Sequence, residues 1–119
     1  MKATIWHNPR CSKSRATLAL LRERGIEPTI VEYLDTPPTA AQLREVLALL
    51  KLKPRELMRR QEAPYADEGL ARADLGDGAL IDAMVAHPIL IERPIVLVEK
   101  AGQRSAAIGR PPEAVLSLL

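Results

Sequence analysis

The sequence predicts an α/β fold built around one mixed β-sheet, and three observations support this class. The first forty residues follow strand-like, helical and strand-like patterns in turn, a β-α-β unit whose two strands usually lie parallel. Residues 39–87 carry mostly helical patterns, and the last third of the chain returns to apolar, strand-like runs. A chain of 119 residues can bury a core without disulfides or a structural metal. We therefore expect a single domain over residues 1–119.

The N-terminal β-α-β unit is interrupted by a proline-containing loop. Residues 3–7 (ATIWH) predict a short strand, and residues 8–10 (NPR) break it. A helix is expected from residue 12 to residue 24, and Gly25 is suited to end it because glycine readily adopts the left-handed conformation that follows many helices. The β-branched run at residues 28–34 (PTIVEYL) predicts the second strand.

The helical block begins with a recognisable N-terminal signal. Thr39 is followed three residues later by Gln42, the spacing of a capping box. Apolar residues then recur at helical spacing: Leu43, Val46, Leu47 and Leu50. A short helical piece is expected after Pro54, then a loop over residues 63–77, with Asp77 as the cap of a further helix.

The last third of the chain predicts a hairpin and a terminal helix. Residues 94–98 form a continuous apolar strand, residues 100–103 turn, and residues 104–108 pair back. A helix is expected over residues 113–119, after two prolines. The resulting order, βαβ, helices, ββα, matches a thioredoxin-like fold with a helical insertion at about residues 39–87. In that fold a catalytic thiol lies where the first strand meets the first helix.

Composition limits the classes of partner and compartment. The 17 basic and 15 acidic residues leave a net charge of only +2, so nothing indicates a nucleic-acid partner. No segment approaches the ~20 apolar residues of a membrane span, and the N-terminus has no apolar run of signal-peptide length. We expect a cytoplasmic protein. Two histidines and one cysteine without ligand spacing also predict no metal site.

Cys11, the only cysteine in the chain, lies at the expected start of the first helix, within WHNPRCSKSR. Helix N-terminal N–H groups favour an anion there, and hydroxyls of Ser12 and Ser14 could donate to its sulfur. Nearby cationic side chains are Arg10, Lys13 and Arg15. The alternative is a small buried cysteine, but the polar, cationic context favours a reactive thiolate. His7 could tune that thiolate, bond the loop, or simply end the strand.

A lone thiol cannot form an intramolecular disulfide or a CxxC pair. Any disulfide chemistry must take its second thiol from another molecule.

Five segments, in order over nearly the whole chain, resemble the glutaredoxin-linked arsenate reductase family. They are HNPRCSKSR, YLDTPPT, ELMRRQEAPY, HPILIERPIV and GRPPE. The resemblance implies a thioredoxin-like core with a helical insertion, and reduction of arsenate to arsenite through one cysteine. It implies glutathione as co-substrate, glutaredoxin as the electron source, arsenate or a similar oxyanion as substrate, and no bound cofactor.

The resemblance also implies roles for particular residues. Cys11 would be the nucleophile that attacks arsenic, and His7 would support it, while Ser14 and Arg15 would hold the loop and lower the thiol pKa. The implied oxyanion-binding residues are Arg59, Arg93 and Arg110. Arginine suits this role because a guanidinium pairs with an oxyanion through two charge-assisted hydrogen bonds.

The sequence leaves one choice of residue open, predicts one cis peptide bond and departs from the family at one pair of residues. Arg59 and Arg60 are adjacent, so only one can face a site. Arg93 precedes a proline, and in thioredoxin-like proteins the corresponding peptide is often cis, which predicts a cis Arg93–Pro94 bond. The best-known family members have Gly-Thr where this chain has Ser12-Lys13, a difference that bears on substrate preference.

Two alternative functions also follow from the resemblance. One is a regulatory module like the Spx-type proteins that bind RNA polymerase, although these use a CxxC switch and CSKS lacks its second cysteine. The other is a glutaredoxin-like thiol oxidoreductase with a different substrate, such as glutathionylated proteins. The sequence does not separate this last activity from arsenate reduction.

Overall fold

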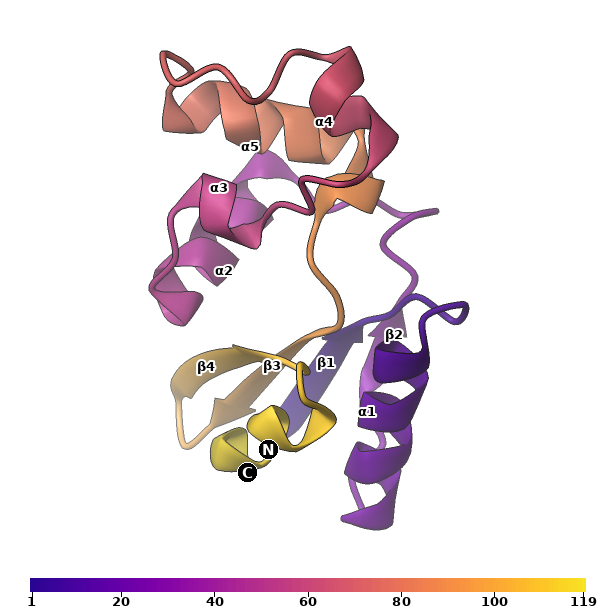
Figure 1. Cartoon of the computed structure of the whole chain (residues 1–119). Coiled ribbons are helices and arrows are strands. Elements are labelled where there is room, and N and C mark those ends of the chain that lie inside the picture. The colour runs from indigo at the N-terminus through magenta and orange to yellow at the C-terminus, as the bar shows by residue number, and fades with distance from the viewer. The chain divides into compact units, whose positions relative to one another are not determined.

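A computed structural model describes residues 1–119, and its strands form one four-stranded sheet in the order β2-β1-β3-β4 (Figure 1). The strands are β1 (Lys2–Trp6), β2 (Thr29–Val31), β3 (Ile95–Lys100) and β4 (Gln103–Ile108). β1 is parallel to β2 and antiparallel to β3, and β3 and β4 form an antiparallel hairpin. The predicted mixed α/β sheet with thioredoxin-like connectivity is confirmed.

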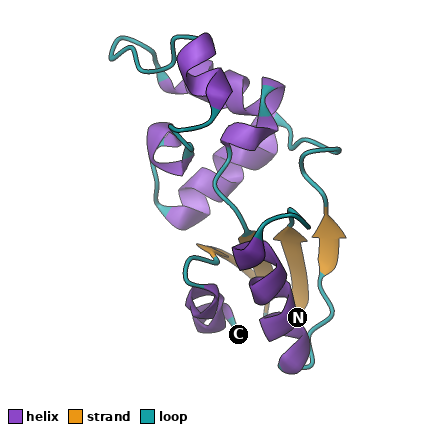
Figure 2. Cartoon of the chain, turned by 45° about the vertical axis from the view of Figure 1, so that its right-hand side comes forward, coloured by secondary structure: helices purple, strands orange, loops and turns teal.

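The chain forms two compact units. The first contains residues 1–36 and 93–119, and the second contains residues 37–92. All four strands lie in the first unit, together with α1 (Ser12–Glu23) and the 3₁₀ helix η2 (Pro112–Leu118). Figure 2 shows that the second unit is built of helices and loops. Its helices are α2 (Ala40–Leu50), α3 (Pro54–Leu57), α4 (Ala63–Asp67), α5 (Asp77–Ala86) and the 3₁₀ helix η1 (Pro88–Leu90).

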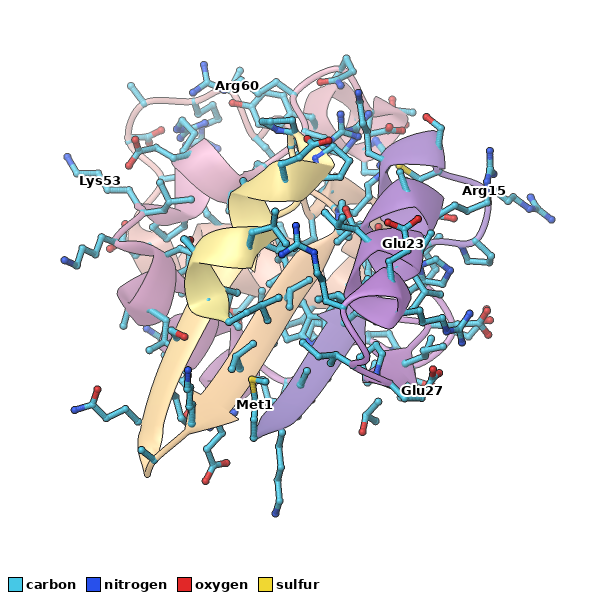
Figure 3. All side chains as sticks on the ribbon, turned by 90° about the horizontal axis from the view of Figure 1, so that it is seen from below. Met1, Arg15, Glu23, Glu27, Lys53 and Arg60 are labelled. Atoms are coloured by element: carbon cyan, nitrogen blue, oxygen red, sulfur yellow. The ribbon has the colours of Figure 1, made fainter.

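The core of the first unit lies between one face of the sheet and the helices α1 and η2 (Figure 3). Because side chains alternate along a strand, Ala3 and Ile5 of β1 share a face, and they pair with Val98 and Val96 of β3. The buried members of this cluster are Ala3, Ile5, Leu18, Leu21, Val96, Val98 and Val115. Each large aliphatic side chain buried there contributes about 1.5–3 kcal/mol to stability.

Helix α1 ends at the predicted glycine. Gly25 has φ +76°, and its N–H donates to the carbonyl of Arg22 over 3.0 Å. The next N–H, of Ile26, donates to the carbonyl of Leu21 over 3.0 Å. This pair of bonds satisfies carbonyls of the last turn, as in a Schellman motif. The glycine thus ends the helix that begins beside Cys11.

The capping box of α2 is also present as predicted. Oγ1 of Thr39 accepts a hydrogen bond from the N–H of Gln42 over 3.1 Å, and Oε1 of Gln42 accepts one from the N–H of Thr39 over 2.9 Å. Three of the four residues at helical spacing, Leu43, Val46 and Leu47, are buried, while Leu50 is half-buried. The apolar face of α2 therefore belongs to the core of the second unit.

Residues 63–77 were expected to be a loop, and this is wrong for residues 63–67, which form α4. The helix is stabilised by a contact from outside the segment. Arg55 donates from Nη1 to the hydroxyl of buried Tyr65 over 2.7 Å and to the carbonyl of Leu70 over 2.5 Å. From Nη2 it donates to the carbonyl of Arg72 over 2.9 Å. These contacts come from outside the segment, so a local pattern within residues 63–77 does not reveal them.

Several element boundaries also differ from the prediction. Gly76, not Asp77, occupies the N-cap of α5, and Asp77 is its first helical residue. The second strand ends at Val31, and a turn follows in which the carbonyl of Glu32 accepts hydrogen bonds from the N–H groups of Asp35 and Thr36 over 3.0 and 2.9 Å. The terminal helix is of the 3₁₀ type. No helix in the structure combines the length and apolar character needed to cross a membrane.

Candidate active site at the start of helix α1

The loop between β1 and α1 presents Cys11 as the N-cap of the helix. Its N–H donates to the carbonyl of Asn8 over 3.0 Å, and its own carbonyl accepts from the N–H of Arg15 over 3.0 Å. Asn8 is buried, and its Oδ1 accepts a hydrogen bond from the N–H of Arg10 over 3.0 Å. These bonds fold the loop tightly and fix the thiol at the first turn of α1.

The surroundings of the sulfur favour the thiolate. Partial burial raises the pKa of the Cys11 thiol. The backbone N–H groups of Ser14 and Lys13 and the guanidinium of Arg93 together lower this pKa by more than burial raises it, so the net shift is downward. Hydrogen bonds and positive charge beside the sulfur stabilise its charged form. Both backbone donors belong to the first turn of α1.

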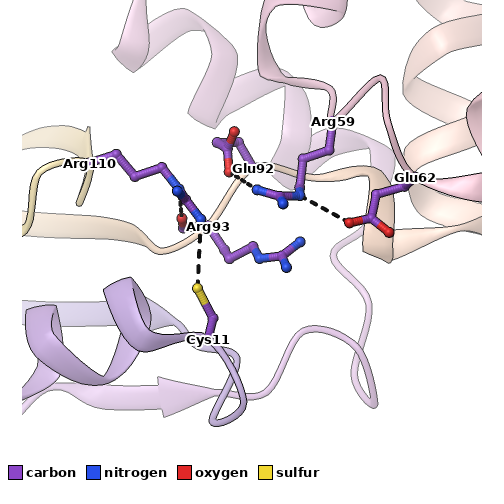
Figure 4. Close-up of polar contacts among 6 residues, drawn as sticks. All are labelled: Cys11, Arg59, Glu62, Glu92, Arg93 and Arg110. Carbon is purple, nitrogen blue, oxygen red and sulfur yellow. Dashed lines mark hydrogen bonds and ion pairs between the residues drawn. The ribbon is translucent and has the colours of Figure 1, made fainter.

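Two arginines from the C-terminal part of the first unit approach the same thiol. Nη2 of Arg110 lies 3.7 Å from Sγ of Cys11, and Nε of Arg110 donates to the carbonyl of Arg93 over 2.7 Å (Figure 4). Both arginines precede a cis peptide bond, to Pro94 and Pro111. The cis bond expected at Arg93–Pro94 is present, and the second one was not predicted. Arg110 is thus held to the chain segment of Arg93 beside the sulfur.

His7 and Ser14 form a buried pair behind the thiol. Nδ1 of His7 lies 2.7 Å from Oγ of Ser14, which also accepts the N–H of Asn8 over 3.0 Å. Burial lowers the pKa of His7; Glu32 opposes this shift, and the charges of Arg22 and Arg15 add to it. A neutral His7 can accept the Ser14 hydroxyl hydrogen, so this hydroxyl holds the loop. Ser14 was expected to donate from its hydroxyl to the sulfur, but its contribution there is its backbone N–H.

Arg15 lies on the exposed side of α1 and extends into solvent (Figure 3). Its Nη1 donates to the carbonyl of Pro9 over 3.0 Å, which links the first turn of α1 to the loop before Cys11. The guanidinium that lowers the pKa of Cys11 is that of Arg93.

Arg59 belongs to the second unit, where two carboxylates bind it. Nη1 lies 2.7 Å from Oε1 of Glu92, and Nε lies 3.3 Å from Oε1 of Glu62 (Figure 4). Partial burial lowers the pKa of Arg59, but the two carboxylates raise this pKa by more than burial lowers it, so the side chain stays protonated. The side chain of Arg59 is 13% exposed, whereas the neighbouring Arg60 is exposed.

Sequence reasoning missed several residues that shape these contacts. Asn8 was seen only as part of a strand break, although an Asn-Pro pair is a known turn signal. Glu92 precedes Arg93 in the chain and carries no recognisable signal of its own. No group of three or more His, Cys, Asp or Glu side chains is placed to hold a metal ion.

The fold and the site define a thioredoxin-like protein with one cysteine at a helix N-terminus, flanked by two arginines, in surroundings that stabilise its thiolate form. The chain belongs to the ArsC family, whose sequence model matches residues 6–118.

Similar proteins cover nearly the whole chain. A protein of Escherichia coli (strain K12) named "Uncharacterized protein YfgD" is 53% identical over 116 residues, 97% of this chain and 94% of that protein. An arsenate reductase of the same strain is 47% identical over 116 residues, 98% of this chain and 79% of that enzyme. The solved structure of an arsenate reductase from Vibrio cholerae matches with a TM-score of 0.93 and 47% identity, over 100% of this chain and 98% of that one.

Proposed function

We propose that this protein is an arsenate reductase that uses Cys11 as nucleophile, glutathione as co-substrate and glutaredoxin as electron source. The observation that carries the proposal is the contact of Arg110 with the sulfur of a cysteine whose pKa is lowered in part by Arg93. An oxyanion needs cationic donors, and a nucleophilic thiol needs its thiolate form. The 47% identity to proteins named arsenate reductase supports the same activity.

Arsenate would bind beside the sulfur through Arg93 and Arg110. The thiolate of Cys11 forms a sulfur–arsenic bond, and one arsenate oxygen leaves as hydroxide, which takes up a proton to become water. The arginines stabilise the negative charge carried by the remaining oxygens. Arsenic is still pentavalent after this step, because one ligand has replaced another.

Reduction follows when a glutathione thiolate attacks the sulfur of Cys11. A disulfide forms between Cys11 and glutathione, the sulfur–arsenic bond breaks, and its electron pair stays on arsenic, which leaves as trivalent arsenite. Two thiols have then lost two electrons, and arsenic has gained two. A glutaredoxin thiolate attacks the glutathione sulfur of this mixed disulfide and releases Cys11 as a thiolate. This sequence explains why one cysteine in the chain is sufficient.

The supporting residues fit distinct parts of this scheme. The His7–Ser14 pair would keep the loop in place while the sulfur changes partners. From the family resemblance we also infer that Arg59 takes part in oxyanion binding; within the second unit its Nε and Nη1 form ion pairs with Glu62 and Glu92. Because Lys13 contributes its backbone N–H to the sulfur, the Ser12-Lys13 pair can replace Gly-Thr without loss of that donor.

We place the protein in the cytoplasm, where glutathione is abundant.

A coupled assay tests the proposal. Arsenate, glutathione, glutaredoxin and glutathione reductase are combined, and arsenate-dependent NADPH oxidation is followed for the wild type and for Cys11→Ser. We expect turnover in the wild type and none in the variant, with the same circular dichroism spectrum for both. Measurable turnover by Cys11→Ser would exclude the mechanism. No turnover by a wild type whose thiol titrates as fully reduced would exclude arsenate as substrate.

The same assay separates arsenate reduction from a glutaredoxin-like activity. Arsenate is replaced by a glutathionylated peptide, with glutathione and glutathione reductase kept and glutaredoxin left out. Rapid, Cys11-dependent NADPH oxidation with the peptide but not with arsenate would assign the thiol to protein deglutathionylation instead.

A further inference from the structure

Gly109 occupies a position that no side chain can share. It is buried at the end of β4, and its N–H donates to the carbonyl of Pro94 over 2.9 Å. A Cβ atom built on Gly109 would overlap Oγ1 of Thr17 and lie 2.8 Å from Cγ of Pro94 and 3.1 Å from Cγ2 of Thr17. Carbon atoms in folded proteins pack at about 3.5–4.0 Å. The backbone at Gly109 therefore lies directly against both neighbours.

The neighbours of Gly109 cannot yield easily to an added methyl group. Oγ1 of Thr17 donates to the carbonyl of Lys13 over 2.8 Å, which fixes the side-chain rotamer, and Thr17 is fully buried in α1. The ring of Pro94 has no rotamer freedom of the ordinary kind. An added Cβ must be accommodated by moving the backbone of residue 109 away from α1.

Gly109 and both of its neighbours, Pro94 and Thr17, belong to segments that carry residues of the thiol site. Gly109 immediately precedes Arg110, whose Nη2 lies 3.7 Å from Sγ of Cys11. Pro94 immediately follows Arg93, whose guanidinium lowers the pKa of the same thiol. Thr17 belongs to α1, whose N-cap is Cys11. Any shift of residue 109 relative to α1 therefore changes the position of a guanidinium relative to the sulfur.

We propose that Gly109 is a positioning residue for the thiolate site, because its missing side chain lets the backbone that precedes Arg110 lie against both Thr17 and Pro94 and so sets the reach of both arginines to Cys11. This role rests on the proposed function, in which Cys11 is the reacting thiol. The φ angle of Gly109 is not in the left-handed region, so the requirement for glycine comes from close approach.

The proposal is tested by the pH profile of thiol alkylation, which requires no arsenate. The rate of reaction of Cys11 with iodoacetamide is measured from about pH 5 to about pH 10 in the wild type and in Gly109→Ala. Since displaced guanidinium groups stabilise the thiolate less, we expect a higher apparent pKa and a roughly three- to tenfold lower thiolate fraction near neutral pH in the variant. A folded Gly109→Ala protein with the wild-type profile would overturn the proposal.

Gly78→Ala is the matched control. Gly78 lies in α5 of the second unit, and the nearest atom to an added Cβ is the flexible end of Arg44 at 4.0 Å. The same chemical change without a clash should leave the alkylation profile of Cys11 unchanged. A shift in this control equal to that of Gly109→Ala would show that the effect is unspecific and would contradict the proposal.

A second variant separates positioning from simple destabilisation. Thr17→Ala removes both Thr17 atoms that the new Cβ would meet, so Thr17→Ala combined with Gly109→Ala should recover part of the lost thiol acidity. This double variant also carries the test if Gly109→Ala alone does not fold. An equal pKa in the single and double variants, or a double variant that does not fold, would assign Gly109 to stability and overturn the proposal.

The outcomes remain separate from those of the reductase assay. If arsenate reduction fails while the alkylation profiles shift as expected, Gly109 positions a thiolate site that serves another substrate. If the profiles do not shift while arsenate is reduced, the positioning role is excluded and the reductase function stands.

Discussion

Arg110 donates from Nε to the carbonyl oxygen of Arg93 over 2.7 Å, while its Nη2 lies 3.7 Å from the sulfur of Cys11. One guanidinium thus bridges the backbone of a second arginine and the thiol. This bridge orients Arg110 by a backbone contact, and such an orientation loses less side-chain entropy on substrate binding. The two arginines therefore present a preorganised cationic surface beside the sulfur.

Replacing Arg93 should make Cys11 less acidic. Arg93 stabilises the thiolate both by a hydrogen bond and by its charge, so Arg93→Ala should raise the pKa of Cys11, and Arg93→Lys should raise it less because the charge remains. Thiolate absorbance in the ultraviolet, followed against pH, measures both effects. Arg72→Ala, which removes an exposed arginine paired with Asp74 in the second unit, is the control. A wild-type pKa in Arg93→Ala would contradict the assigned contact.

The lowered pKa of Cys11 also makes stability depend on pH, with a definite sign. The pKa of Cys11 is lower in the folded protein than in the unfolded chain. Such a thiol stabilises the folded protein fully at pH values above its unfolded-state pKa, and this stabilisation is lost as the pH falls through its folded-state pKa. The unfolded value is about 8.5. The difference in unfolding free energy between the wild type and Cys11→Ser should therefore increase from about pH 5 to about pH 9.

Urea denaturation of both proteins at several pH values measures this difference. A comparison with Cys11→Ser cancels the titration of the other groups, which both proteins share. A difference that stays constant, or that decreases as pH rises, would show that the folded protein does not favour the thiolate.

Much of the fold was predictable because its signals are local. The parallel β1–β2 pair and the β3–β4 hairpin follow from short apolar runs and turn residues, whereas the β1–β3 pairing joins distant segments and was expected only from the match to a thioredoxin-like fold. As expected, α1 ends before Gly25, and α2 begins at the Thr39–Gln42 capping box. The position of Cys11 at the start of α1 followed directly from these elements.

The rest depended on contacts between distant parts of the chain. The segment that contains α4 accepts three hydrogen bonds from Arg55, at the Tyr65 hydroxyl and at the carbonyls of Leu70 and Arg72. The hydroxyl of Ser14 lies 2.7 Å from Nδ1 of His7 in a buried pair that no local pattern predicts. The arginines at the thiol were inferred from family resemblance, since no local pattern brings Arg93 and Arg110 to residue 11. Tertiary packing, and not local preference, determines these details.

Removing the Ser14 hydroxyl should weaken the fold more than it changes the thiol. Ser14→Ala leaves the buried Nδ1 of His7 and the N–H of Asn8 without this partner, which should lower the unfolding free energy by about 1–3 kcal/mol. The backbone N–H of Ser14 still reaches the sulfur. The pKa of Cys11 should therefore change less than it does in Arg93→Ala.

Urea denaturation and thiol titration of the same samples test this separation. Ser117→Ala is the control, because Ser117 is exposed and bonds a carbonyl on the surface of η2. A Cys11 pKa shift in Ser14→Ala as large as that in Arg93→Ala would mean that the hydroxyl, and not the backbone N–H, supports the thiolate.

Arg55 should determine the order of the segment that contains α4. Arg55→Ala removes the donors to the Tyr65 hydroxyl and to the carbonyls of Leu70 and Arg72. Because Tyr65 is buried, its hydroxyl loses a partner in a place that water reaches poorly, and we expect a loss of roughly 1–3 kcal/mol in local stability. Amide hydrogen exchange should accelerate in residues 63–72 and stay unchanged in α1 and the sheet. Arg44→Ala, on α2 of the same unit, provides the comparison; unchanged exchange over residues 63–72 in Arg55→Ala would show that α4 is held by its apolar contacts alone.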